Sequence, residues 1–376
     1  YGIFGMKLKE KNDINNTNFS PEFTARKSVF TFGKRIICIG TDINNNNADF
    51  VTETTLFQNS IKNSTEKISV NGTFTNINDY SFDSGIASAP TVLSDLSGNF
   101  YRISERNRVL ISGGEQVSAH NKTKAETRGN FVTARIDHGQ APISAHYEYM
   151  TMLKPSPAEQ RNWTSNPEYQ IIRADKTAHI VFDEISKTTA IVSFELTRSD
   201  EGLIKSISEE TLLMYNETDN GTIAMSVCDP SLHFPEKTKN SESTLLEGSK
   251  VQKQILLEGT KELVNPNEVV EVSYQNGNTL LTVNCKLGIP VEFVLKNTVS
   301  NTKNITENKL KISKNDNSLT IHGQTDAATL FDSTGRMLEN QTFSSMEKTF
   351  YTDKNQIYFL WAQLSDNSVF TRKLML

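Results

Sequence analysis

Residues 166–196, "NPEYQIIRADKTAHIVFDEISKTTAIVSFEL", contain three short apolar runs separated by polar residues. The runs are "YQIIRAD", "AHIVFDE" and "TAIVSFEL". Each is rich in β-branched or aromatic residues, which favour strands. The segment therefore predicts a meander of three consecutive antiparallel strands.

Similar runs recur along the chain, whereas helical periodicity is nearly absent. Clusters of Gly, Asn and Asp such as "SGN", "DNG" and "QNGN" separate them and indicate turns. Many short strands at this spacing predict an all-β fold built from antiparallel sandwiches. The other runs are "RKSVFTF", "RIICIG", "ETTLFQ", "KISVNGTF", "FYRIS", "RVLISG", "HYEYMTML", "GTIAMSV", "TLLTVNC" and "IPVEFVL".

The length of 376 residues allows two or three domains. Polar stretches at 213–220 and 298–305 suggest boundaries between them. We therefore expect three parts: residues 1–213, 214–300 and 306–376. In the last part, "LFDSTGRMLENQTF" predicts a hairpin that turns at Ser333-Thr334-Gly335, and "IYFLWAQLSDNSVFTRKLML" predicts another.

Composition excludes several classes of function. A net charge of -5 argues against a nucleic-acid or general polyanion binder. Cys38, Cys228 and Cys285 are far apart and form no metal-binding spacing, so no metal site is expected and Cys38 is assigned to the core. No apolar run approaches the roughly 18 residues of a membrane span. The chain does not begin with Met, and its opening "YGIFGMKLKE" already resembles a strand, so we expect a piece of a longer protein.

Common catalytic motifs are missing from the sequence. It has no GxGxxG, Walker A, GxSxG or HExxH motif, and "SGGEQ" at 112–116 is expected to be a turn. His138, before a glycine, is interpreted as a turn residue rather than a base. Tyr147 and Tyr149, after His146, share one face of a predicted strand. They form either a platform for sugar stacking or part of the packing.

The stretch "VTETTLFQNS", residues 51–60, places Glu53 among strand formers. The polar loop "DINNNNADF" leads directly into it, and such loops often carry functional groups over a binding surface. From the pattern alone, Glu53 either lies on a solvated sheet face or serves a function.

Three ordered stretches resemble polysaccharide lyase family 8, the family of chondroitin, hyaluronan and xanthan lyases. They are "NFSPEFTARKSVFTFGKRIICIGTDI", "VTETTLFQNSI" and "GNFVTARIDHGQAPISAHYEYMTML". These stretches are most similar in sequence to the broad-specificity chondroitin ABC lyases, and the resemblance covers residues 1–296. It implies a large multi-sheet antiparallel super-sandwich, followed by one or two smaller β-sandwich domains.

The resemblance also implies a catalytic role for Glu53. In that subfamily the catalytic groups are His, Tyr, Arg and Glu, and the Glu comes from the strand that matches "VTETTLFQ". The other three come from a helical toroid on the N-terminal side, which nothing in this chain matches. We therefore expect Glu53 to face a cleft completed by a missing helical domain, and the chain alone to be inactive.

The implied activity is β-elimination at a uronic acid by a secreted, periplasmic or surface-bound bacterial lyase. The substrate is an acidic polysaccharide, with no cofactor expected, although some relatives respond to divalent cations. No substrate-binding residue is assigned. Near the cleft, a basic group either adds positive potential or forms an ordinary solvated face: Arg26, Lys27, Lys34 and Arg35.

Two alternatives remain open. The chain could instead be a non-catalytic carbohydrate-binding or adhesion sandwich, since Asn-rich loops on β-sandwiches also suit those roles. Residues 306–376 resemble the C-terminal sorting domains of secreted Bacteroidetes proteins through "LFDSTGRML" and the final "KLML". Their alternative is a small accessory β-sandwich.

Overall fold

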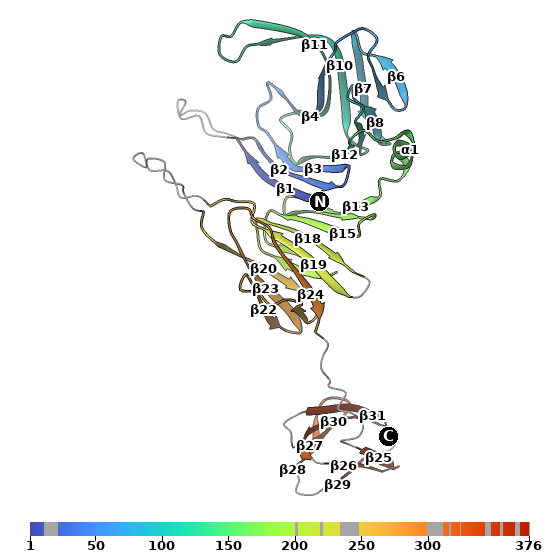
Figure 1. Cartoon of the computed structure of the whole chain (residues 1–376), viewed down its shortest axis with the longest axis vertical. Coiled ribbons are helices and arrows are strands. Elements are labelled where there is room, and N and C mark those ends of the chain that lie inside the picture. Colours follow the sequence, from blue (N-terminus) through green and yellow to red (C-terminus); the bar gives the residue numbers. More distant parts are fainter. Residues whose placement is uncertain are drawn as a thin grey trace, which may run out of the picture. The chain divides into compact units, whose positions relative to one another are not determined.

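The computed structural model describes residues 1–10, 22–199, 202–218, 221–233, 248–298, 311–315, 317–323, 325–342, 347–353, 356–364 and 369–375. The chain divides into two compact units, Tyr1–Asn297 and Thr298–Leu376 (Figure 1). Antiparallel sheets dominate both units, so the predicted all-β class is confirmed.

The first unit begins with an eight-stranded sheet, sheet A, in the order β1-β2-β3-β12-β9-β8-β5-β6. Strands β2, β3 and β12 include the predicted runs "RKSVFTF", "RIICIG" and "HYEYMTM". The strands are β1 Gly2–Lys9, β2 Thr24–Phe32, β3 Arg35–Asn44, β5 Lys67–Val70, β6 Thr73–Asn76, β8 Thr91–Ser94, β9 Phe100–Ile103 and β12 Ala145–Met152.

A four-stranded sheet, sheet B, covers one face of sheet A in the order β4-β11-β10-β7. Its strands are β4 Val51–Ser60, β7 Tyr80–Ile86, β10 Arg108–Ala119 and β11 Glu126–Gln140. Inward residues such as Phe57, Val132 and Ile136 pack against Cys38 and Ile43 of sheet A. The assignment of Cys38 to the core is thereby confirmed.

A seven-stranded sheet, sheet C, has the order β13-β14-β15-β18-β19-β24-β21. Its first three strands are the predicted meander, paired antiparallel in sequence order. The strands are β13 Tyr169–Ala174, β14 Ala178–Asp183, β15 Thr188–Ser193, β18 Thr211–Glu217, β19 Thr222–Cys228, β21 Lys261–Leu263 and β24 Val291–Asn297.

A five-stranded sheet, sheet D, completes the unit in the order β16-β17-β20-β23-β22. Residues Ile255, Leu281 and Val283 of this sheet pack against Leu213 and Val227 of sheet C. The strands are β16 Thr197–Arg198, β17 Ile204–Ile207, β20 Val251–Leu257, β22 Val270–Gln275 and β23 Asn278–Cys285.

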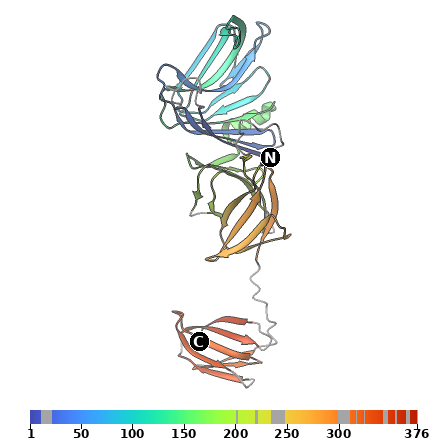
Figure 2. The ribbon, with the colours of Figure 1, turned by 90° about the vertical axis from the view of Figure 1, so that its left-hand side faces the viewer.

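The four sheets of this unit are stacked in the order B, A, C, D (Figure 2). Sheets A and C therefore carry a core on each face. Their central strands β3 and β15 are consequently apolar or small on both faces, and every residue of β15 is buried. This explains why "RIICIG" and "TAIVSF" read as continuous rather than alternating runs.

Sheets A and C meet in an apolar core that also holds two polar links. Buried Phe30 and Ile37 contact Val181 and Val192 there. His179 of β14 bridges the sheets, because its Nδ1 lies 2.7 Å from Ser28 Oγ and its Nε2 lies 2.8 Å from Thr41 Oγ1.

The second polar link is a buried ion pair. Arg35 Nη2 lies 2.5 Å from Asp183 Oδ1, and both side chains are almost fully buried. Arg35 was expected to contribute to surface potential or a solvated face, and that expectation is wrong because the guanidinium is enclosed between the sheets. Buried charges are tolerated only when they are paired in this way.

One helix, α1 (Pro157–Ser165), joins β12 to β13 within the described residues. Ser156 accepts from Glu159 N, and the Glu159 carboxylate accepts from Ser156 N, which is a capping box. Pro157 occupies the first turn, where a missing N–H costs nothing. Trp163 is the buried residue that fixes the helix to the core between sheets A and C.

The second unit is a small sandwich of two sheets, β25-β26-β29 and β28-β27-β30-β31. Both predicted hairpins are confirmed, as β27–β28 and β30–β31. Asp332 Oδ1 closes the first turn by accepting from Thr334 N and Arg336 N. The strands are β25 Lys311–Asn315, β26 Ser318–His322, β27 Thr325–Phe331, β28 Met337–Thr342, β29 Glu347–Tyr351, β30 Ile357–Leu364 and β31 Val369–Met375.

The expected boundary between residues 213 and 214 falls inside β18, whose neighbours β15 and β19 lie on either side of it in sequence. Backbone hydrogen bonds of sheet C therefore continue across that boundary. The expected linker at 298–305 lies, apart from its first residue, outside the described residues.

The prediction of a turn at 112–116 is wrong, because these residues lie within β10. A glycine is needed at position 113 of this strand, because a Cβ there would lie 2.1 Å from the Ile77 carbonyl oxygen. No helix of the described residues is long and apolar enough to cross a membrane.

Acid is expected to weaken the interface between sheets A and C. Burial lowers the pKa of His179 to about 4, whereas an unfolded histidine titrates near 6.5. The unfolded chain therefore binds a proton that the folded chain does not, and His179 alone should lower stability by about 1 kcal/mol per pH unit between pH 6.5 and pH 4.

Urea unfolding, followed by Trp163 fluorescence in a Trp361→Phe background, measures this slope. His179→Gln should flatten the slope whatever its own cost, and His120→Gln on the exposed β10–β11 hairpin should leave it unchanged. An equal slope in both variants would contradict the assignment to His179.

Candidate functional site on the outer face of sheet B

Strand β4 turns alternate residues to opposite faces. Thr52 and Thr54 are buried against sheet A, while Val51, Glu53 and Thr55 point outward. The Glu53 side chain keeps 32% of its surface exposed. It therefore lies on a solvated face, as one of the two sequence interpretations required.

Glu53 lies directly opposite Asp137 of β11, which places two carboxylates side by side. Such like-charge pairs destabilise a sheet unless other charges offset them. Arg135 Nε lies 2.6 Å from Glu53 Oε1, and Arg108 Nη1 lies 3.1 Å from Asp137 Oδ2. Each carboxylate thus has its own guanidinium.

The charges continue across the sheet to its edge strand. Arg108 also binds Asp83 of β7 at 2.6 Å, and the hydrogen bond lowers the pKa of Asp83 to about 2. Arg135 Nη1 donates to Ser112 Oγ of β10 at 3.3 Å. The outer face of sheet B therefore carries a network of paired acidic and basic groups that spans all four strands.

Stability does not account for this arrangement. The Arg135 side chain is 28% exposed, and ion pairs at such positions contribute about 1 kcal/mol or less. Glu53, Arg135, Arg108 and Asp137 line none of three cavities elsewhere in the described part of the chain. It is an open, polar and ordered surface, which suits contact with another polar surface or ligand.

The opposite face of β4 holds it in place. Thr54 Oγ1 lies 2.8 Å from His138 Nε2, and Asn45 Nδ2 donates to Thr52 Oγ1 at 3.1 Å. The Asn45 contact also anchors the Asn-rich loop to the start of the strand. Glu53 is thus presented by a strand whose inward side chains are hydrogen-bonded.

His138 lies at the bulged end of β11, and its ring faces the interior. It stacks on Tyr147 with centroids 6.0 Å apart, and Tyr147 stacks on Tyr149 at 5.8 Å. Burial lowers the pKa of His138 to about 4. It is therefore neutral at pH 7 and turned away from the outer face.

The two tyrosines belong to the packing and not to a sugar platform. Tyr147 is 5% exposed, and Tyr149 packs against the same core. Burial raises the pKa of both hydroxyls well above the ordinary value, so neither forms a tyrosinate near neutrality. His146 lines a separate cavity of about 210 Å³.

Most residues of the predicted basic group already form ion pairs with carboxylates. Arg26 Nη2 lies 3.2 Å from Glu195, and Lys34 Nζ lies 3.4 Å from Glu159. Within the described ranges, no group of three or more His, Cys, Asp or Glu could hold a metal ion.

Arg135 was missed by the sequence reasoning. "TARID" does place Arg135 and Asp137 on one face of a strand, but nothing in the sequence shows that β11 pairs with β4 in this register. The pairing of Glu53 with Arg135 depends on that register.

Exposed apolar side chains flank Glu53 at the start of β4. Phe50, Val51 and Ile143 are 70%, 53% and 85% exposed. Their loops are joined, since Asn45 N donates to Pro142 O and Ser144 N donates to Asn44 Oδ1. Apolar groups gathered in this way often mark an interface.

Residues 1–162 match polysaccharide lyase family 8, super-sandwich domain. This match includes β4, β10, β11 and thus the whole of the charged face. The resemblance inferred from the sequence is confirmed. The lyase match ends within α1.

Characterised relatives extend the similarity. The chain is 30% identical over 300 residues to a chondroitin sulfate ABC endolyase of Proteus vulgaris, with 78% of this chain and 28% of that protein covered. It is 28% identical over 313 residues to a chondroitin sulfate ABC exolyase of Bacteroides thetaiotaomicron, covering 78% and 29%. The chain thus spans less than a third of these relatives.

Solved structures share the fold. A xanthan lyase of Paenibacillus superposes with a TM-score of 0.61 at 17% identity, covering 100% of this chain and 40% of that one. A chondroitinase AC lyase superposes with a TM-score of 0.55 at 17% identity, covering 78% and 38%. At these identities the likeness supports the architecture alone.

Proposed function

We propose that this chain is the β-sheet part of a longer bacterial glycosaminoglycan lyase, exported to the periplasm, cell surface or medium. In this proposal, the outer face of sheet B forms one wall of the catalytic cleft, with Glu53 and Arg135 at its centre. The observation that carries the proposal is the exposed ion pair between these two residues, on the sheet that matches the lyase family.

The proposed reaction is β-elimination at a uronic acid. Removal of the weakly acidic C5 proton requires a base and a cation that neutralises the adjacent carboxylate. Arg135 supplies a guanidinium suited to a carboxylate, and Glu53 Oε1 forms an ion pair with it, 2.6 Å from Nε. Glu53 is thus proposed to position Arg135, and a cationic or tyrosine group from the other wall, rather than to abstract the proton.

The base must then come from another part of the protein. Tyr147 is buried and His138 is half-buried behind the sheet, with its ring stacked on Tyr147, so neither is on the outer face with Glu53. A helical domain carrying His, Tyr and Arg is the proposed second wall. The exposed Phe50, Val51 and Ile143 beside Glu53 support a docking contact at this place.

The alternative is a sandwich that binds carbohydrate or mediates adhesion without chemistry. The polar strip formed by Gln58, Gln116 and Thr133 on the same face supports sugar binding in either case, because its hydrogen-bonded amides are exposed. The two functions differ in whether Glu53 affects turnover.

In the longer protein, Glu53→Gln should lower kcat by about 10²-fold, because Arg135 would lose the group that orients it. KM should change far less, and the melting temperature should stay within a few degrees, since the ion pair is exposed. Initial rates of unsaturated uronate formation measure kcat and KM separately.

Glu126→Gln is the matched control, because Glu126 is also an exposed glutamate of sheet B, on β11, paired with Arg128 at 2.7 Å near the hairpin tip. It should retain normal turnover. Normal kcat in Glu53→Gln would refute the positioning role.

The chain of residues 1–376 alone should not cleave chondroitin, because no base lies beside Glu53 within the described structure. Ultraviolet absorbance of unsaturated uronate products tests this, with a complete chondroitin lyase as the positive control. Product formation by the purified chain would contradict the proposal that a helical wall is required.

A further inference from the structure

A groove lies on sheet C, which sheet A separates from sheet B in the stack. Sheet A covers part of sheet C and ends at its edge strand β1, which contacts β15 and β18. Beyond β18 the same face of sheet C is open. A pocket of about 870 Å³ occupies this open area, within the size range of ligand sites.

Two cross-strand rows form its floor. Met214, Ser226 and Glu292 are successive partners across β18, β19 and β24. The next row runs from Asn216 to Ala224 and then to Val294. The pairing register thus mixes apolar and polar side chains on a single face, with Met214, Ala224 and Val294 apolar and Ser226, Glu292 and Asn216 polar.

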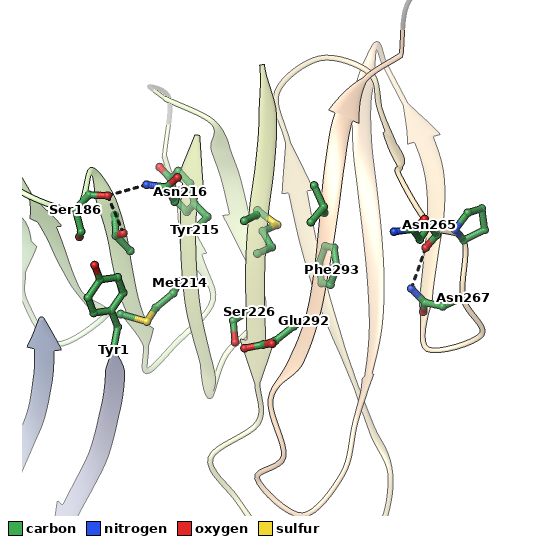
Figure 3. A pocket seen from close by; sticks show the side chains of 15 residues that line it. Tyr1, Ser186, Met214, Tyr215, Asn216, Ser226, Asn265, Asn267, Glu292 and Phe293 are labelled. Atoms are coloured by element: carbon green, nitrogen blue, oxygen red, sulfur yellow. Dashed lines mark hydrogen bonds between the residues drawn. The ribbon is translucent and has the colours of Figure 1, made fainter. Parts of the chain in front are cut away.

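The two ends of the pocket come from different segments. Figure 3 shows Tyr1 beside Met214 at one end, and Asn265 and Asn267 at the other. Ser226 and Glu292 lie next to each other between them. The floor is the face of a sheet and not its edge, so a peptide could not bind by adding a strand.

Several polar groups in the groove have no hydrogen-bond partner within the described residues. They are the Ser226 hydroxyl, the Glu292 carboxylate and the Asn265 amide. Asn216 uses its Nδ2 to bind the carbonyls of Ser186 and Lys187, which leaves its Oδ1 to accept. A hydroxyl-rich ligand satisfies such a mixture of donors and acceptors.

The charge of the groove indicates which hydroxyl-rich ligands, charged or neutral, it can bind. Glu292 is the charged residue of the lining, and nearby Lys296 is paired with Glu262 at 3.0 Å. Glu292 would repel a carboxylate or sulfate. Met214, Ala224 and Val294 instead offer an apolar surface for the C–H face of a sugar ring.

We propose that this groove binds an uncharged oligosaccharide, at a site separate from the charged face of sheet B. The groove would hold a neutral glycan next to the enzyme, independently of the acidic substrate proposed for Glu53. This inference does not depend on the lyase activity.

Saturation-transfer NMR and calorimetric titration of the purified chain test the proposal. The probes are β1,4-linked tetrasaccharides of glucose and of N-acetylglucosamine, with a chondroitin tetrasaccharide as the charged comparison. At least one neutral probe should bind at millimolar concentration or below, and more tightly than the charged probe. Binding of neither neutral probe, or tighter binding of the charged one, overturns the proposal.

Ala224→Trp places a large ring on the exposed floor and should weaken neutral binding at least 10-fold. Val294→Trp should do the same, which keeps the test valid if one variant fails to fold. Ser273→Trp on the exposed edge strand β22 is the matched control and should bind normally. Normal binding in folded Ala224→Trp and Val294→Trp would place the sugar elsewhere and overturn the assignment.

Glu292→Gln tests the charge argument separately. It should retain the neutral probe and improve binding of the chondroitin tetrasaccharide several-fold. No gain for the charged probe would show that Glu292 does not exclude anions from the groove.

Discussion

Burial of two sheets on both of their faces is the constraint on which the first unit depends. Sheet A lies between sheets B and C, and sheet C lies between sheets A and D. Strands β3 and β15 have no solvated face, so they must be apolar or hydrogen-bonded throughout. The few polar groups at this interface, such as His179 and Arg35, are satisfied by partners from the opposing sheet or its loops.

Because of this constraint, charged side chains are more easily accommodated on the outer faces of the stack than between its sheets. Sheet B buries one face against sheet A and is free to carry charges on the other. The charges there are not scattered, because Glu53 and Asp137 lie opposite each other and each is neutralised by an arginine. Such an arrangement adds little to stability, so we attribute it to binding and catalysis.

In the proposed function, the open face is the reason for a second surface. A cleft that excludes water strengthens the interaction of Arg135 with a carboxylate, whereas an exposed sheet face does not. The histidine and tyrosines near β4 are committed to the core, where burial keeps them neutral. In the proposed function, chemistry at Glu53 therefore depends on groups that approach from outside.

The strands were largely predictable from the sequence, because β-branched runs and turn residues are local signals. The helix at 157–165 was missed, although Ser156, Pro157 and Glu159 form a recognisable capping pattern. The turn expected at 112–116 failed because two glycines there serve a close approach within a strand.

The site was predictable only in part. The role of Glu53 stays a prediction from resemblance, since its place in the strand alternation alone fitted an ordinary solvated face. Arg135 and the burial of Arg35 were not predictable, because both depend on which strands pair and which sheets stack. Long-range register of this kind leaves no local trace in a single sequence.

A double-mutant cycle on turnover in the longer protein tests most directly whether Glu53 acts through Arg135. The cycle compares Arg135→Gln in the normal background with the same change in a Glu53→Gln background. If Glu53 positions Arg135, the second substitution should add little once the first is present. Losses that simply multiply would show that the two residues act independently, and would contradict the proposed cleft wall.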